Sequence, residues 1–555
     1  MKHKFGITSF FAVIVTALAV ISFQSCSKKL DEAYLNPNNP IEGSIEAILP
    51  NVINQMTSTA APPAGGGGGS YGPVCESVNL GKYIQFWNLN ATGDNYDQMG
   101  GVYATASDNT GLVWAMHYYG IGQNAKFIIS RGTEQKKWDY VGVANAIFAF
   151  SWLTLTEEYG EVILKDAFNQ SLQQFRYDQQ SAVYDTVRQI CDSAIMYLNK
   201  TGDGVSAANL AYGDGYMYGG DVNKWKKFVY AIKARTFAHL SNKSFYASKG
   251  YADSAIKYCD LSITNNADNA MQKWVGGNFS GTNNYFGPYR GNIGTLRQSA
   301  FIANLLTGVG TTSPFKGVFD PRTPYLINEN TNGTYKGVLP NQGTSGLVTA
   351  DQPKNFWRAA FSSTASTADS GRYIFANLAP FPIITAAEIQ FVKAEAAFRK
   401  GDKALALAAY TNGINLSFDM LINTYQTRIP SAAQITPATR AAYLANPAVV
   451  PTVAASLTLS QIMLQKYIAL YGYGFNETWV DMRRYHYVDK DPTTGNQVYA
   501  DFTLPTTLTI YNAGKLAYRC RPRYNSEYLY NIPALQSIGA LASDYHTKEH
   551  WFSQP

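Results

Sequence analysis

Aromatic and amide side chains gather in an irregular stretch between residues 87 and 103. The face of a tryptophan or tyrosine ring stacks on the apolar face of a sugar or side chain, while amides and carboxylates hydrogen-bond its polar edge. These residue types therefore suit a site for a neutral polar ligand. An alternative role for the rings is to anchor the loop locally. The predicted ligand contacts in this stretch are Trp87, Asn90, Asp94 and Tyr96.

A second irregular stretch, from residue 274 to residue 290, has the same composition. An arginine there could add cation–π stacking to the aromatic surface. Charged residues make up only 15% of the chain, against about 25% in typical globular proteins. That scarcity of charge also favours a neutral ligand. The predicted contacts in this second region are Trp274, Tyr285, Tyr289 and Arg290, together with Trp357.

Glu388 and Glu395 are seven residues apart and would share one face of a helix. Two carboxylates on one face could perform acid–base catalysis. Their segment is rich in alanine, however, which indicates a buried helix in which each glutamate pairs with an arginine or a backbone group. The candidate partners are Arg235, Arg483 and Arg484. We therefore predict a structural role for both glutamates and no catalytic residue.

Two further polar clusters predict packing rather than ligand contact. The first runs from Trp479 to Arg484, and the second contains Tyr524, Glu527 and Asn531. A tryptophan near a helix start with arginines one turn later is typical of a packing clamp, and we interpret the second cluster in the same way.

The sequence predicts no metal site and no cofactor, and it leaves calcium binding open. Cys75, Cys191, Cys259 and Cys520 form no C-x-x-C pair, so redox and zinc motifs are absent. Their disulfide state is left open by the sequence. Two histidines near the C-terminus, at positions 546 and 550, are four residues apart and could chelate a metal on a helix. The last twenty residues instead look like a surface tail.

The first 26 residues have the organisation of an export leader. Lys2 and Lys4 precede an apolar run from Phe5 to Phe23, and Gln24-Ser25-Cys26 follows. Small residues followed by cysteine resemble a bacterial lipobox, where cleavage frees the cysteine for lipidation. We predict a signal peptide over residues 1–25 and a lipid anchor on Cys26 that holds the chain on a membrane. Soluble secretion and an uncleaved anchor are the alternatives.

These candidate residues must be positioned by the rest of the chain, in which helical spacing of apolar residues dominates. We predict a tether and first helix over 26–70, helical repeats over 71–265, and further helical repeats with a closing segment over 381–555. Glycine, asparagine, proline and aromatic residues dominate 266–380, which predicts an irregular ligand-face subdomain. The predicted fold is mostly α, a tetratricopeptide-like helix-pair scaffold with a large loop-rich ligand-binding subdomain.

Several motifs in order along the mature chain resemble the SusD/RagB-type outer-membrane nutrient-binding lipoproteins of Bacteroidetes. Asn525 stands where this family commonly has proline, so the chain resembles a divergent branch. The segments that carry the resemblance are Cys26–Glu32, Asn36–Pro40 with Ile48–Pro50, Lys233–Arg235 with Leu240–Asn242, Ala387–Ala396 with Gly401, Asp402 and Tyr410, Glu477–Arg484, and Arg521–Glu527 with Asn531.

The resemblance implies a non-catalytic lid, lipid-anchored at the outer membrane and exposed on the cell surface, that delivers a nutrient to a SusC-like TonB-dependent barrel. It implies four tetratricopeptide-like helix pairs beneath a loop-rich ligand face. An oligosaccharide is the favoured ligand and an oligopeptide the alternative. A surface glycoside hydrolase is disfavoured because only Asp94 and Asp97 lie beside the loop tryptophans. The net charge of +6 includes no dense basic run, so no nucleic-acid partner is predicted.

Overall fold

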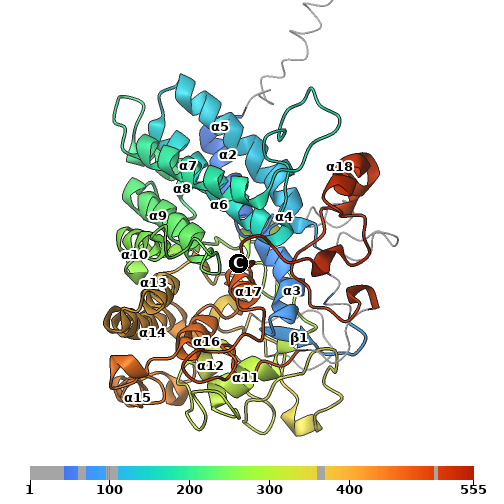
Figure 1. Cartoon of the computed structure of the whole chain (residues 1–555). Helices are drawn as coiled ribbons and strands as arrows, with labels where there is room; N and C mark the ends of the chain where they lie inside the picture. Colours follow the sequence, from blue (N-terminus) through green and yellow to red (C-terminus); the bar gives the residue numbers. More distant parts are fainter. Residues whose placement is uncertain are drawn as a thin grey trace, which may run out of the picture.

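The described part of the chain is mostly helical, which confirms the predicted fold class (Figure 1). Within it, no helix combines the length and apolar character needed to cross a membrane. The predicted leader, Cys26 and Tyr96 lie outside the described residues. The computed structural model describes residues 43–59, 70–94, 97, 99, 110–358, 369–504 and 510–555.

The N-terminal half is a run of helices in which successive members pack against each other. Helix α5 packs on α6, α6 on α7, α7 on α9, and α9 on α10, while α2 packs on α8. A π-helix, Met116–Ile121, joins α4 to α5. The helices are α2 (Ile45–Gln55), α3 (Pro73–Tyr83), α4 (Leu112–Ala115), α5 (Gly122–Glu134), α6 (Trp138–Tyr159), α7 (Gln180–Leu198), α8 (Ala207–Asp214), α9 (Val222–Ala238) and α10 (Tyr251–Leu261).

The C-terminal half continues the same stack. Helix α10 packs on α13, and α13 packs on α14 and α16, so Figure 1 shows the helices stacked down one side of the molecule from α5 to α14. The helices of this half are α13 (Ala386–Lys400), α14 (Lys403–Tyr425), α15 (Pro437–Leu444), α16 (Leu459–Ala469), α17 (Phe475–Arg484) and α18 (Ile532–Ser537).

The turn between α13 and α14 illustrates how local sequence sets a helix boundary. Gly401 follows α13 with a φ of 88°, a left-handed conformation that glycine adopts without steric cost. Asp402 then caps α14, and its side chain accepts a hydrogen bond from the backbone N–H of Leu405 at 3.0 Å. A glycine stop followed directly by an aspartate cap folds the two helices back on each other.

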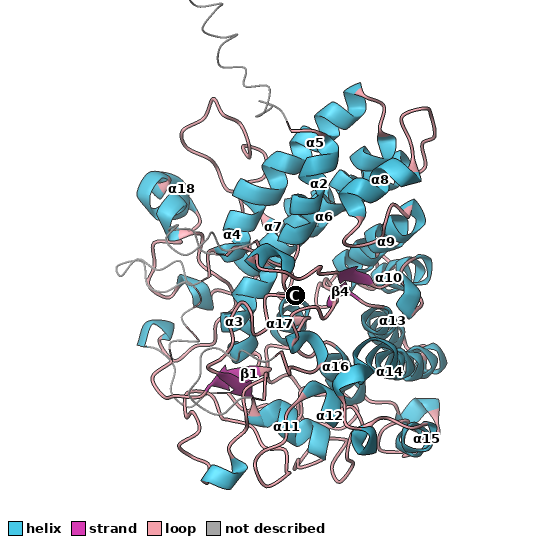
Figure 2. Cartoon of the chain, turned by 180° about the vertical axis from the view of Figure 1, so that it is seen from behind, coloured by secondary structure: helices cyan, strands magenta, loops and turns pink. Residues whose placement is uncertain are grey.

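The segment between α10 and α13 contains short elements joined by loops. In this segment β2 (Ala270–Gln272) pairs antiparallel with β4 (Phe381–Ile384), and β3 (Leu296–Gln298) pairs antiparallel with β1 (Trp87–Leu89), which follows α3. Figure 2 shows β1 and β4 in different parts of the molecule. Two short α-helices, α11 (Ala300–Thr307) and α12 (Thr323–Leu326), also lie in this segment.

Buried ion pairs connect the helices at the centre of the stack. Arg235 of α9 lies 2.6 Å from Glu388 of α13, and Arg484 of α17 lies 2.6 Å from Glu395 of α13. The predicted pairing of both glutamates with arginine is therefore confirmed. Arg483 instead lies with its guanidinium carbon 3.7 Å from the centre of the Trp479 ring, so that cluster is the predicted packing clamp.

The predicted surface tail is wrong, because the C-terminal residues are packed into the fold. His546, His550 and Phe552 are fully buried. Arg519 fixes this segment by donating to the backbone carbonyl of Lys548 at 2.8 Å. The residues of the tail do not by themselves indicate these contacts, because the basic side chain that binds the tail lies well before it in the chain. All four described cysteines are buried free thiols.

Candidate ligand-binding site

The predicted contacts between residues 87 and 94 lie partly in the core and partly in the loop that follows β1. Trp87 is fully buried, and its indole N–H donates to the Ser77 carbonyl at 3.2 Å. Asp94 forms an ion pair with Lys82 at 2.8 Å. The Asn90 carbonyl accepts a hydrogen bond from the Thr344 N–H at 3.0 Å. These contacts are structural, and the burial of Trp87 leaves its ring unable to stack on a ligand.

The second group is also spread over different environments. Trp357 is fully buried and donates to the Phe286 carbonyl at 2.7 Å, while the Trp87 ring lies 5.4 Å from the Phe286 ring. The structure thus brings the two predicted tryptophans to one core residue rather than to a surface. Arg290 stacks on Tyr285 at 4.8 Å. It also donates to the Thr59 carbonyl at 2.9 Å.

Two predicted residues remain accessible or close to a cavity. Tyr289 is 48% exposed. Trp274 lines a cavity of about 180 Å³ together with Asn51, Asn54 and Tyr216. Within the described residues the Trp274 indole N–H is buried without a hydrogen-bond partner. Trp274 is therefore the member of the predicted set whose placement best suits ligand contact.

A larger cavity, of about 330 Å³, includes Glu527 and Asn531, for which the sequence predicts a packing role. We call it the tyrosine cavity, because its rim carries Tyr119, which is 50% exposed, and Tyr530, which is 71% exposed. Trp114 forms part of the apolar wall, and Tyr530 lies just before α18, which stands beside α4 in Figures 1 and 2. The polar rim is made of exposed amides: Gln123, Asn169, Gln170 and Gln173.

Local backbone features place the aromatic side chains of this cavity. Tyr118 and Tyr119 belong to the π-helix, a wider turn that is frequent at functional sites. Phe168 lines the cavity with a φ of 62°, which is unusual for a bulky residue. A Cβ on Gly122 would lie 2.1 Å from the Phe168 ring. Glycine at the start of α5 is therefore what allows Phe168 to approach so closely.

A buried carboxyl group fixes the part of the cavity wall formed by residues 526–531. Glu527 accepts hydrogen bonds from the Tyr177 hydroxyl and the Asn531 amide, both at 2.8 Å. The Asn531 amide also donates to the Phe175 carbonyl at 2.9 Å. Burial raises the pKa of Glu527, and the hydrogen bonds from Asn531 and Tyr177 oppose that rise. The predicted structural role of Glu527 and Asn531 fits these contacts, although both residues also line the cavity.

The tyrosine cavity was missed because its walls come from three distant parts of the sequence. One signal could have indicated it: the run Asn169-Gln170-Ser171-Leu172-Gln173-Gln174 places several amides between two helices. Such a run is typical of polar-ligand loops when aromatic residues lie nearby in space. The sequence does not reveal that proximity.

Comparisons with solved structures show which fold this arrangement belongs to. The fold is similar to a SusD/RagB family protein of Bacteroides thetaiotaomicron, with a TM-score of 0.62 and 19% identity over 92% of this chain and 99% of that one. It is also similar to a chitin-binding protein, with a TM-score of 0.65 and 19% identity over 92% and 100% of the two chains. A chitin-binding SusD homolog from Flavobacterium johnsoniae gives a TM-score of 0.63 and 17% identity over 92% and 98%.

No curated protein sequence matches the chain. Residues 37–507 match the model of a SusD-like family described as starch-binding and associating with the outer membrane. That match covers most of the sequence, and the helical fold agrees with it. The chain belongs to the SusD-like family.

Proposed function

We propose that this protein is a non-catalytic carbohydrate-binding subunit of the outer membrane and that the tyrosine cavity holds an oligosaccharide. The main observation that supports this proposal is the pair of exposed rings, Tyr119 and Tyr530, on a rim of exposed amides. Exposed rings can stack on the apolar faces of pyranose units while amides bond their hydroxyls. The family description and the chitin-binding proteins of similar fold support the same ligand class.

The chemistry of the cavity favours binding over hydrolysis. Glycoside hydrolysis generally needs two carboxyl groups on opposite sides of the scissile bond. Glu527 is the one carboxyl group among the described residues that line the cavity, and it is occupied by Tyr177 and Asn531. A single carboxyl group engaged in holding the wall supplies neither a nucleophile nor a free general acid.

The proposal extends to the setting in which the ligand is captured. The protein is anchored through a lipid on Cys26, lies at the cell surface and acts as the lid of a SusC-like TonB-dependent barrel. This part rests on the lipobox-like leader, on the resemblance of the ordered motifs, and on the family's association with the outer membrane. Co-purification of a large barrel from detergent-solubilised outer membranes is the expected result, and its consistent absence would contradict the lid role.

Calorimetry with malto- and chito-oligosaccharides tests the ligand proposal. Removal of both rings in a Tyr119→Ala/Tyr530→Ala variant should weaken sugar binding by roughly fivefold or more, because each stacked ring contributes about 0.5–1.5 kcal/mol. Tyr212→Ala is the matched control, since Tyr212 is 79% exposed and does not line the cavity. Unchanged sugar binding by the double variant, or binding of oligopeptides in place of sugars, would contradict the proposal.

A further inference from the structure

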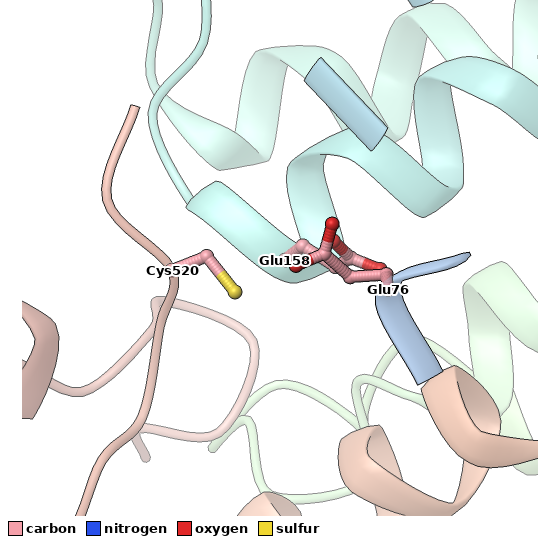
Figure 3. A group of neighbouring side chains, drawn as sticks. All are labelled: Glu76, Glu158 and Cys520. Carbon is pink, nitrogen blue, oxygen red and sulfur yellow. The ribbon is translucent and has the colours of Figure 1, made fainter. Parts of the chain in front are cut away.

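Two carboxyl groups and a thiol meet in the interior, away from the rim of the tyrosine cavity. Glu76 lies on α3, Glu158 near the end of α6, and Cys520 in the segment before α18. All three side chains are fully buried. Their ligand atoms lie within 4.8 Å of one another. Figure 3 shows the Glu76 and Glu158 side chains next to each other, with the Cys520 sulfur pointing toward them.

Glu158 is the member of this group that calls for a partner. In the part of the chain that the structure describes, neither of its carboxylate oxygens has a hydrogen-bond partner, although both are buried. A buried polar group without a partner loses its hydration and gains nothing in return. Glu76 differs, because one of its oxygens accepts the Leu112 N–H at 3.0 Å. The orphaned oxygens of Glu158 lie in the same group as the Cys520 sulfur.

We propose that Glu76, Glu158 and Cys520 form a structural binding site for a divalent cation of the zinc class. Zinc accepts carboxylate oxygen and thiolate sulfur in one tetrahedral site, with three or four protein ligands. A thiolate ligand argues against calcium and magnesium, which prefer oxygen alone. The Thr110 side chain is buried and lies beside the Cys520 thiol, so its hydroxyl could supply a further oxygen.

The local charges are consistent with a divalent ion. Without a cation, burial together with the neighbouring Glu76 carboxylate raises the pKa of Glu158 well above its ordinary value. Burial and the charge of Glu158 likewise raise the pKa of the Cys520 thiol. With all three ligands ionised, a divalent ion and the nearby Arg483 guanidinium would together balance their charge. The site would thus exchange protons for the metal on binding.

The position of the group explains what a bound ion would do for the fold. The Cys520 N–H already donates to the Glu158 carbonyl at 2.7 Å, so the C-terminal segment and α6 touch at this point. Leu112, bonded by Glu76, begins α4, and Trp114 of α4 lines the tyrosine cavity. An ion bound to all three side chains would join α3, α6 and the C-terminal segment directly behind that wall.

Metal content of the purified full-length chain tests the site. The detergent-solubilised protein is unfolded, refolded in the presence of zinc and freed of excess metal. Plasma mass spectrometry then measures the zinc bound per chain. We expect about one zinc per chain. Cys520→Ser and Glu158→Gln should each lower the zinc content at least about tenfold. Cys259→Ser, which removes a buried thiol outside the group, should keep the zinc content of the unaltered chain.

Cadmium provides a second readout that reports on the sulfur directly. A thiolate–cadmium charge-transfer band should form in the unaltered chain and in Cys259→Ser, and should be missing in Cys520→Ser. Glu158→Gln keeps the shape of a neutral carboxyl group and should fold. If Cys520→Ser does not fold, the zinc content of Glu158→Gln tests the site instead. An unaltered chain that refolds with zinc yet retains none, or a cadmium band that persists in Cys520→Ser, would overturn the proposal.

Discussion

The Arg484 guanidinium donates to both carboxylate oxygens of Glu395, at 2.6 and 2.8 Å, and this buried bidentate pair joins α17 to α13. The Tyr485 hydroxyl donates to the same carboxylate at 2.6 Å. Arg484 therefore holds the pKa of Glu395 below its ordinary value despite the opposing effect of burial. Removal of the carboxylate would leave the buried Arg484 guanidinium with Asp481 as its remaining acidic partner.

Glu395→Ala should lower the free energy of unfolding by about 3–5 kcal/mol, the usual cost of breaking a buried ion pair from one side. Urea denaturation measures this difference. The control is Glu134→Ala, which removes an exposed pair with Arg131 and should cost less than about 1 kcal/mol. Sugar binding by the Glu395→Ala variant, measured under conditions where it is folded, should be unchanged. Equal stability of the two variants would contradict this account of α13.

His239 should make the protein less stable as pH rises. Burial alone would lower its pKa, but the carboxylates of Glu477 and Glu157 outweigh burial and raise the pKa to about 9. A folded-state pKa above the unfolded value near 6.5 means that the stabilisation is complete below about pH 6.5 and is lost as pH rises through about 9. The free energy of unfolding should therefore fall by up to about 3 kcal/mol between these two pH values. Urea denaturation at a series of pH values measures this fall.

His239→Gln should remove most of that pH dependence. His486 is the matched control, because Glu549 and Asp489 also raise its pKa to about 9, although its side chain is partly exposed. Solvent screening weakens its contribution, so His486→Gln should leave most of the slope in place. If the pH dependence of stability persisted in His239→Gln and disappeared in His486→Gln, His486 and not His239 would be its source.

Trp87→Ala and Trp274→Ala should have different effects. Trp87 is enclosed by Phe286 and Phe356, so its truncation should cost about 3–5 kcal/mol of stability through the cavity that remains. Trp274 borders the smaller cavity, and its truncation should leave the protein folded while weakening ligand binding if that cavity extends the site. Thermal melts and calorimetry on both variants separate the two roles; a stable Trp87→Ala with weakened binding would contradict the assignment.

Cys26→Ala tests the anchor separately from the binding site. The variant should bind sugar normally after purification, because the described lining of the tyrosine cavity comes from residues 114–123, 163–175 and 526–531. Uptake of that sugar by cells should be lost, since a lid without its lipid would leave the membrane. Transport of labelled oligosaccharide is the measurement, with Cys191→Ala as a control for loss of a thiol. Normal uptake by Cys26→Ala would exclude an essential anchor.

The sequence predicted the scaffold better than the site because the two depend on different kinds of information. The pairing of Glu388 and Glu395 with arginines could be inferred from an alanine-rich helix, in which any carboxylate must find a cation. Whether Trp87 faces ligand or core depends on Phe286 and Phe356, which lie far away in the chain. The residues next to Trp87 in the sequence would be the same whether its ring faced a ligand or the core. The local sequence therefore does not indicate that this loop aromatic is buried.

The tyrosine cavity and the proposed zinc site share that difficulty. Tyr119 belongs to the π-helix, whose wider turn gives its side chains a different register from that of an α-helix. Cys520 and Glu76 belong to opposite ends of the chain and carry no spacing motif. Sites assembled from such distant segments become visible only when the packing of α3, α6 and the C-terminal segment is known.

The central ion pairs also determine how the molecule can come apart. Arg235, Lys466 and Glu477 connect α9 of the first half to α13, α16 and α17 of the second, at distances of 2.6–3.2 Å. Neither half can separate without exposing uncompensated charge, so unfolding should be a single cooperative event. Fragments cut in the middle of the chain are therefore expected to be insoluble when expressed alone and to recover structure only when both are present together.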